Sequence, residues 1–272
     1  MDDDLSLKMS LGYKTRLFLI LFLAGMAGVV SILLLDLSAV FSLIPVQAGT
    51  ELPTITPLLK LLSLIQPSLI LALAVFVGLT LAPKVGLSAP VAESAASGSA
   101  IGTALRPQLI PGLIGGALGG LAVIVVAALC KPFMTPDTVE RIAAFTRLTP
   151  IPTRLLYGGI TEELLLRWGL MTLLVWATWR VLQKRQSTPG TSCFVTAILL
   201  SSLVFGIGHL PIAYMLFPQV STAVLLLVIV ANSAFGLVAG YLYWKKGLES
   251  AMIAHMFGHI VMAGASYARL YF

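Results

Sequence analysis

Six ionisable residues lie inside apolar stretches of the second half of the sequence. They are Glu162, Glu163, Arg167, His209, His255 and His259, and they include all three histidines of the chain. A charged side chain at the centre of a lipid bilayer costs at least about 2.5 kcal/mol on insertion scales, so each one needs a partner or a task. Carboxylates and imidazoles in such positions are typical of acid–base chemistry, proton relays and metal binding.

The spacing of Glu162, Glu163 and Arg167 along a helix predicts which of them interact. Residues four apart share a helix face, so Arg167 is expected to neutralise Glu163 within the helix. Glu162 points about 100° away from this pair and has no counter-ion on its own helix. A carboxylate without a local counter-ion suits a general base, so Glu162 is the candidate catalytic acid–base residue. In the alternative interpretation, Glu163 and Arg167 are a structural ion pair, and Glu162 faces water or caps a loop.

The histidines form a second group. His255 and His259 are also four residues apart, so both imidazoles leave the same helix face. They are donors to an oxyanion, metal ligands completed by His209 or a glutamate, or histidines satisfied by neighbouring carbonyl groups. His209 follows Phe205 by one turn, which allows the aromatic ring to pack against the imidazole. The spacing alone leaves these alternatives open.

These residues have to be positioned by membrane-spanning helices. Of the 272 residues, 58% are hydrophobic and 10% are charged, a balance that a soluble globular domain could not solvate. A helix needs about 20 mostly apolar residues to cross the hydrocarbon core. The sequence therefore predicts an all-α membrane protein, a polytopic bundle of about seven to eight transmembrane helices. The predicted spans are roughly 16–35, 58–82, 109–129, 153–180, 193–217, 220–243 and 248–271.

The segments around the third predicted span differ in composition. Residues 86–104 are rich in Ala, Ser and Gly and are expected to form a flexible connection. Residues 138–148 are expected to form a short amphipathic helix on the membrane surface. Within the third span, Gly112, Gly116 and Gly120 recur at intervals of four, which predicts that a neighbouring helix approaches closely there.

The chain is interpreted as a single transmembrane domain over residues 1–272, with a motif-bearing core in residues 153–271. The net charge of +6 does not indicate a nucleic-acid partner, because basic residues gather at span ends, as Lys184, Lys245 and Lys246 do. The expected surroundings are the lipid bilayer, without nucleic acid.

Three motifs follow one another on separate predicted spans. They are Glu162-Glu163-Leu-Leu-Leu-Arg167, then Phe205 with His209 four residues later, then His255 with His259 four residues later. This order resembles the CPBP family, which comprises CAAX-prenyl proteases, bacteriocin-processing enzymes and abortive-infection proteins. The family motifs are EExxxR, FxxxH and HxxxN or HxxxD on a bundle of about eight helices, and the resemblance covers roughly 153–271. The chain departs from the family at His259, where the family has Asn or Asp.

The resemblance implies an intramembrane endopeptidase that hydrolyses a peptide bond of a membrane-associated protein or peptide. It implies that Glu162 and His209 activate the attacking water and that Glu163 and Arg167 support their helix. His255 would stabilise the oxyanion, and a histidine at position 259 can still donate a hydrogen bond to it. The implied location is the plasma (inner) membrane of a prokaryote.

The cofactor and the function class have alternatives. If zinc is bound, the expected ligands are Glu162, His209, His255 and His259. A metal-free mechanism is preferred, because the Asn usual in the family would be a poor zinc ligand. A proton- or metal-coupled transporter would use the same residues as a relay, although no inverted repeat is apparent. The third class is a non-catalytic membrane scaffold or immunity protein.

Overall fold

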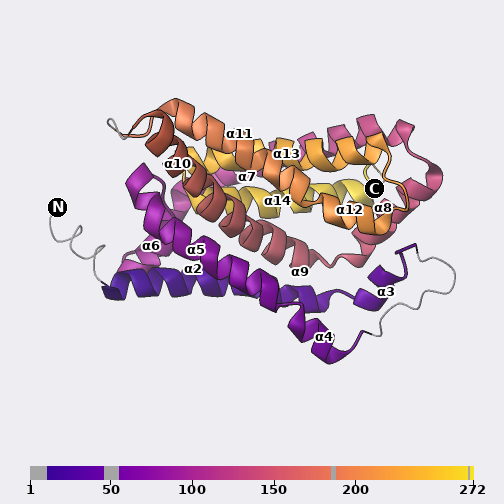
Figure 1. Cartoon of the computed structure of the whole chain (residues 1–272), viewed down its shortest axis with the longest axis horizontal. Coiled ribbons are helices and arrows are strands. Elements are labelled where there is room, and N and C mark those ends of the chain that lie inside the picture. The colour runs from indigo at the N-terminus through magenta and orange to yellow at the C-terminus, as the bar shows by residue number, and fades with distance from the viewer. Residues whose placement is uncertain (1–10, 46–54, 185–187, 269) are drawn as a thin grey trace.

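The computed structural model describes residues 11–45, 55–184, 188–268 and 270–272. Within these residues every regular element is helical, and the long helices run beside one another along the long axis of the molecule (Figure 1). The chain is therefore an all-α membrane protein, as its apolar composition predicts.

Long helices make up most of the bundle and shorter ones connect them. The long helices are α2 (Leu11–Ser31), α5 (Ile65–Val85), α7 (Ile101–Cys130), α11 (Thr191–Gly208), α13 (Thr222–Lys245) and α14 (Leu248–Tyr267). The short ones are η1 (Ile32–Leu34), α3 (Leu37–Phe41), α4 (Pro57–Leu62), α6 (Pro90–Ser97), η2 (Lys131–Phe133), α8 (Pro136–Leu148) and α12 (Leu210–Leu216). The fourth predicted span consists of α9 (Ile151–Thr153), η3 (Arg154–Glu162), η4 (Leu164–Met171) and α10 (Thr172–Leu182).

The predicted number of seven to eight membrane crossings is not confirmed. In the described part of the chain, five helical stretches are long and apolar enough to cross a membrane: Leu11–Leu34, Pro57–Val85, Ile101–Phe133, Thr191–Leu216 and Thr222–Lys245. The predicted spans 153–180 and 248–271 are helical but fall outside this set. Both carry ionisable residues, which lower their apolar character, so the predicted total is not confirmed.

The small-residue face of α7 packs against α14, as its glycine spacing predicts. A Cβ atom on Gly116 would lie 2.6 Å from the carbonyl oxygen of Ala254, and one on Gly120 would lie 3.1 Å from that of Gly258. Side chains at these positions would push the two backbones apart. The glycines thus hold α14, the helix of His255 and His259, close to the bundle.

The fourth predicted span is largely π-helical, whereas the sequence predicts an ordinary α-helical span. The π-helical segments η3 and η4 flank Glu163 on both sides. Such segments are rare in proteins overall, and those that occur are frequently found at functional sites. Gly159 lies on this span where Met256 of α14 occupies the space that a side chain would need. The change of helix type therefore falls where the acidic residues are presented to α14.

Helix α2 fixes the start of this π-helical span from the other side. The hydroxyl of Thr161 donates to the carbonyl oxygen of Gly25 at 2.7 Å, and that of Thr153 donates to Ser31 at 2.8 Å. All four residues are buried. These hydrogen bonds satisfy backbone carbonyls in a region without water and hold the span in register.

The connection 86–104 contains more order than its composition predicts. It includes α6, whose first backbone amides, those of Val91 and Ala92, donate to one carboxylate oxygen of Glu249 at 3.0 and 2.9 Å. A long-range side-chain cap of this kind leaves no signal in local composition. The predicted short helix at 138–148 is confirmed, because α8 covers it, and its location on the membrane surface stays a prediction.

Candidate active site

Glu163 and Arg167 form the ion pair that their spacing predicts. Their side chains are completely buried, and Arg167 Nε lies 3.2 Å from Glu163 Oε2. Arg167 also donates from Nη2 to the carbonyl oxygen of Gly236 at 3.1 Å, and its guanidinium lies over the Phe205 ring at 5.0 Å. This pair therefore connects the fourth span to α13 and α11 without access to water.

His255 of α14 lies between the two glutamates. Its Nδ1 atom is 2.7 Å from Glu163 Oε1, and its Nε2 atom is 3.9 Å from Glu162 Oε2. A carboxylate paired with a guanidinium accepts hydrogen bonds, so Nδ1 of His255 carries the proton of this contact. The Nε2 atom is then the edge of the ring that faces Glu162. Spacing within one helix did not indicate this contact between helices.

Glu162 differs from Glu163 in its surroundings, as the sequence predicts. Its side chain is 18% exposed, whereas that of Glu163 is inaccessible. The Nε2 atom of His255, which comes from another helix, lies 3.9 Å from its carboxylate. Glu162 is thus the more accessible carboxylate of the two, while Glu163 is held by two partners.

His209 is oriented by the residue one turn before it. Its Nδ1 atom lies 2.8 Å from the carbonyl oxygen of Phe205, and the two rings meet edge to face at 4.9 Å. Because a carbonyl oxygen can only accept, Nδ1 carries the proton and Nε2 of the neutral ring is an acceptor. Phe205 also lies edge to face with His255 at 5.8 Å. The Phe205 ring thus connects the histidine of α11 to that of α14.

His259 lies beside His255 on the same helix face. The two rings are stacked, with centroids 5.0 Å apart. A Cβ atom on Gly158 would lie 2.6 Å from His259 Nε2, so the absence of a side chain at position 158 makes room for this imidazole. The histidine at position 259 is larger than the Asn or Asp of the family motif, and the neighbouring π-helical segment thus accommodates it.

Two residues around the site were not among the predicted ones. Phe235 of α13 packs on His255 with ring centroids 4.4 Å apart, and Gly158 borders His259. An aromatic residue and a glycine within apolar spans are common, so their types carry no signal. Only the packing of the helices identifies them.

The predicted zinc ligands do not converge on a common point. Among the described residues, no group of three or more His, Cys, Asp or Glu side chains could hold a metal ion. The Nδ1 atoms of His209 and His255 are hydrogen-bonded to the carbonyl oxygen of Phe205 and the carboxylate of Glu163, respectively. Histidines that bind zinc through one ring nitrogen usually make such a hydrogen bond with the other. Without a third converging donor, however, the arrangement does not fit structural or catalytic zinc.

Comparison with known protein families gives one match. Residues 144–261 match the family described as type II CAAX prenyl endopeptidase Rce1-like. The matched segment contains all six ionisable residues of the candidate site and ends within α14. No curated protein and no solved structure matches the chain.

Proposed function

We propose how this membrane protease works, from the premise that residues 144–261 belong to the CPBP family of intramembrane endopeptidases. This premise rests on the match of these residues to the Rce1-like family. We propose that it hydrolyses a peptide bond of a membrane-associated protein or peptide by attack of a water molecule that Glu162 activates. One observation carries the proposal: His255 contacts both Glu163 and the more accessible Glu162. A base and a potential oxyanion donor thus lie side by side.

The balance of charge supports an oxyanion-binding role for His255. Among Glu162, Glu163, Arg167 and His255, the two carboxylates carry two negative charges and the guanidinium of Arg167 carries one positive charge. A proton on His255 makes this group neutral overall, which lowers the cost of its burial. The charged imidazole donates from Nδ1 to Glu163 and presents Nε2–H for an oxyanion beside Glu162. Glu163 and Arg167 act as positioning residues in this scheme.

His209 has the complementary hydrogen-bonding property. Since its Nδ1–H donates to Phe205, the Nε2 atom of its neutral ring accepts a hydrogen bond. We assign to it the orientation of the attacking water, together with Glu162. Its partial exposure agrees with a position that water can enter.

The proposed reaction follows from these assignments. Glu162 takes a proton from water as the water oxygen attacks the peptide carbonyl carbon, and negative charge develops on the carbonyl oxygen. His255 donates to this oxygen from Nε2, with His259 as the second donor. The carbon–nitrogen bond then breaks, and Glu162 returns its proton to the leaving amine. The products are a carboxylic acid and an amine, which become carboxylate and ammonium when the acid passes its proton to the amine, and Glu162 is regenerated.

The substrate class follows from the family and from the surroundings of the site. The matched family is described as acting on CAAX prenyl proteins, and we propose a membrane-associated peptide or protein for this chain. We further propose that residues 1–272 form one membrane domain, with the catalytic core in 153–271, in the plasma membrane of a prokaryote.

The test replaces Glu162 with Gln and His209 with Ala in separate variants. Peptide termini in the membrane fraction are compared by mass spectrometry between cells that carry each variant and cells that carry the wild-type protein at equal abundance. We expect new termini only with the wild-type protein. If both variants gave the same new termini as the wild-type protein, the proposal would be overturned. Proton flux in reconstituted vesicles that depends on these residues would favour a transporter.

A further inference from the structure

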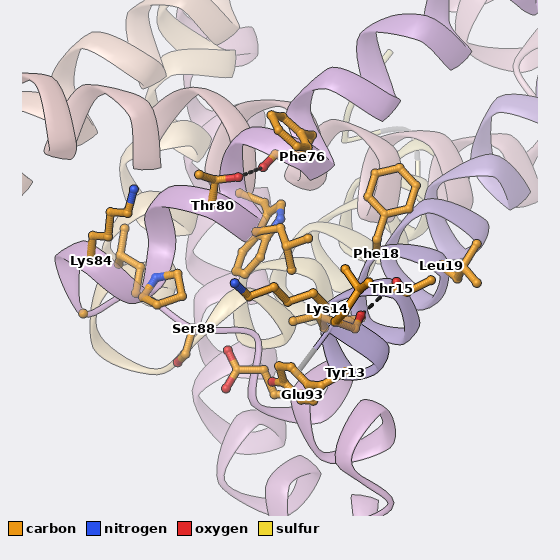
Figure 2. A pocket seen from close by; sticks show the side chains of 17 residues that line it. Tyr13, Lys14, Thr15, Phe18, Leu19, Phe76, Thr80, Lys84, Ser88 and Glu93 are labelled. Atoms are coloured by element: carbon orange, nitrogen blue, oxygen red, sulfur yellow. Dashed lines mark hydrogen bonds between the residues drawn. The ribbon is translucent and has the colours of Figure 1, made fainter. Parts of the chain in front are cut away.

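A cavity of about 1110 Å³ lies between α2, α5 and the segment that joins α5 to α6 (Figure 2). Its walls are mainly apolar and include Phe18, Phe76, Leu79 and Trp168. Sites for small molecules have volumes of about 300–1,000 Å³, so this cavity is slightly larger than that range. None of the six residues of the candidate active site lines it. It therefore has room for a hydrocarbon chain at a place that the proposed reaction does not use.

Two of the three charged residues that line the cavity are cationic. Lys14 near the start of α2 and Lys84 in the last turn of α5 both line it, and neither forms an ion pair with any residue that the structure describes. Figure 2 shows Lys14 extending between Phe18 and Ser88, with Lys84 at one edge. The acidic residue of the lining is Glu93.

Glu93 does not cancel the two lysines. One of its carboxylate oxygens accepts a hydrogen bond from the backbone amide of Ala89 at 3.0 Å, at the start of its own helix α6. The carboxylate is thus engaged by backbone, where a negative charge is favourable. Two exposed ammonium groups remain next to an apolar cavity, which complements a ligand with an anionic head and an apolar tail.

The cavity lies at the end of the bundle where basic residues gather. Leu248 of α14 donates its backbone amide to Ser88, so the C-terminal end of α13, with Lys245 and Lys246, lies at this same end. An excess of Lys and Arg is typical of the cytoplasmic side of membrane proteins. The cytoplasmic leaflet carries anionic lipids, and basic pockets between helices on this side bind their headgroups.

We propose that this cavity binds an anionic phospholipid of the cytoplasmic leaflet. Its phosphate lies between Lys14 and Lys84, and one acyl chain follows the apolar wall toward Trp168. The floor of the cavity is fixed, because the indole of Trp168 donates to the carbonyl oxygen of Val75 at 3.2 Å. The proposal is independent of the proposed peptidase reaction.

The experiment uses two photoactivatable lipids with the same labelled acyl chain, a phosphatidylglycerol and a phosphatidylcholine. The full-length protein is reconstituted in vesicles that contain either lipid at equal mole fraction, and the cross-linked peptides are mapped by mass spectrometry. We expect phosphatidylglycerol to label segments 11–19 and 76–88 about thirtyfold more than phosphatidylcholine, which is roughly fivefold for each lysine.

Variants separate a charge-dependent site from apolar filling. The double variant Lys14→Gln with Lys84→Gln should be labelled equally by both lipids. The double variant Lys14→Arg with Lys84→Arg should keep the preference for phosphatidylglycerol. The control variant Lys246→Gln should match the wild-type protein. Equal labelling of the wild-type protein by both lipids would show a cavity filled by any acyl chain and would overturn the proposal. A preference that survives in the double glutamine variant would overturn it as well.

Discussion

The imidazole of His255 hydrogen-bonds the carboxylate of Glu163 across the contact between α14 and the fourth span, with Nδ1 2.7 Å from Oε1. The two residues are 92 positions apart in the chain and both are buried. Arg167 engages the other oxygen of the same carboxylate. Glu163 therefore orients His255 while its own charge is balanced by the guanidinium.

The substitution Glu163→Gln removes the charge from this contact. It leaves Arg167 buried without a counter-ion, and breaking a buried pair in this way costs about 3–5 kcal/mol. We expect the free energy of unfolding in detergent to fall by about that amount. The control is Glu140→Gln, since Glu140 pairs with Arg147 on the surface and such pairs contribute less than about 1 kcal/mol. Equal losses in both variants would contradict the structural role of Glu163.

The substitution Gly158→Ala tests the placement of His259. The added methyl group would lie 2.6 Å from His259 Nε2 and displace the imidazole. We expect peptide cleavage to fall by about tenfold to a hundredfold, the usual effect of moving a catalytic group by about 1 Å, while abundance is retained. Cleavage is measured as the rate of appearance of new peptide termini in membranes.

A second substitution shows whether the loss arises at position 259. In the Gly158→Ala, His259→Asn variant the smaller side chain removes the overlap, so we expect cleavage above the product of the two single effects. Gly264→Ala on α14 is the matched control, because a Cβ atom there meets nothing within 4 Å. Multiplicative effects of the two substitutions would show that Gly158 and His259 do not interact.

The contact between α7 and α14 makes a prediction about stability. Gly116→Ala would place a methyl group 2.6 Å from the carbonyl oxygen of Ala254, and we expect unfolding to become easier by about 1–3 kcal/mol. Gly102→Ala on the same helix meets nothing within 4 Å, so its higher helix propensity should leave stability unchanged or slightly higher. Thermal unfolding of the two variants in detergent gives this comparison directly.

The role of metal is tested by chelation. Since no three candidate ligands converge in the described residues, we expect purified protein to keep its cleavage rate after treatment with chelators. Elemental analysis of the same preparation measures bound zinc. Stoichiometric zinc together with loss of cleavage after chelation would show that the imidazoles rearrange around a metal.

Helical spacing predicted what occurs within single helices. The Glu163–Arg167 pair, the packing of Phe205 on His209 and the small-residue face of α7 are all present, because residues three or four apart in a helix are neighbours whatever the tertiary structure.

The side-chain contacts between helices at the candidate site did not follow from spacing. The Glu163–His255 hydrogen bond and the packing of Phe235 on His255 depend on how α13 and α14 are rotated against the fourth span. The π-helical geometry of that span changes this rotation, and its sequence resembles that of any apolar helix. The cavity between α2 and α5 was missed for the same reason.

Glu162, as the residue that activates water, is central to the proposed reaction. The direct measurement is the rate at which purified protein in vesicles cleaves a membrane peptide that cells with the wild-type protein also cleave. Glu162→Gln should lower this rate by about 100-fold to 10,000-fold, the contribution of a general base, with unfolding unchanged and Glu140→Gln at the wild-type rate. A Glu162→Gln protein that cleaves within about twofold of the wild-type rate would contradict the account, because its hydrolysis would then need no base at this position.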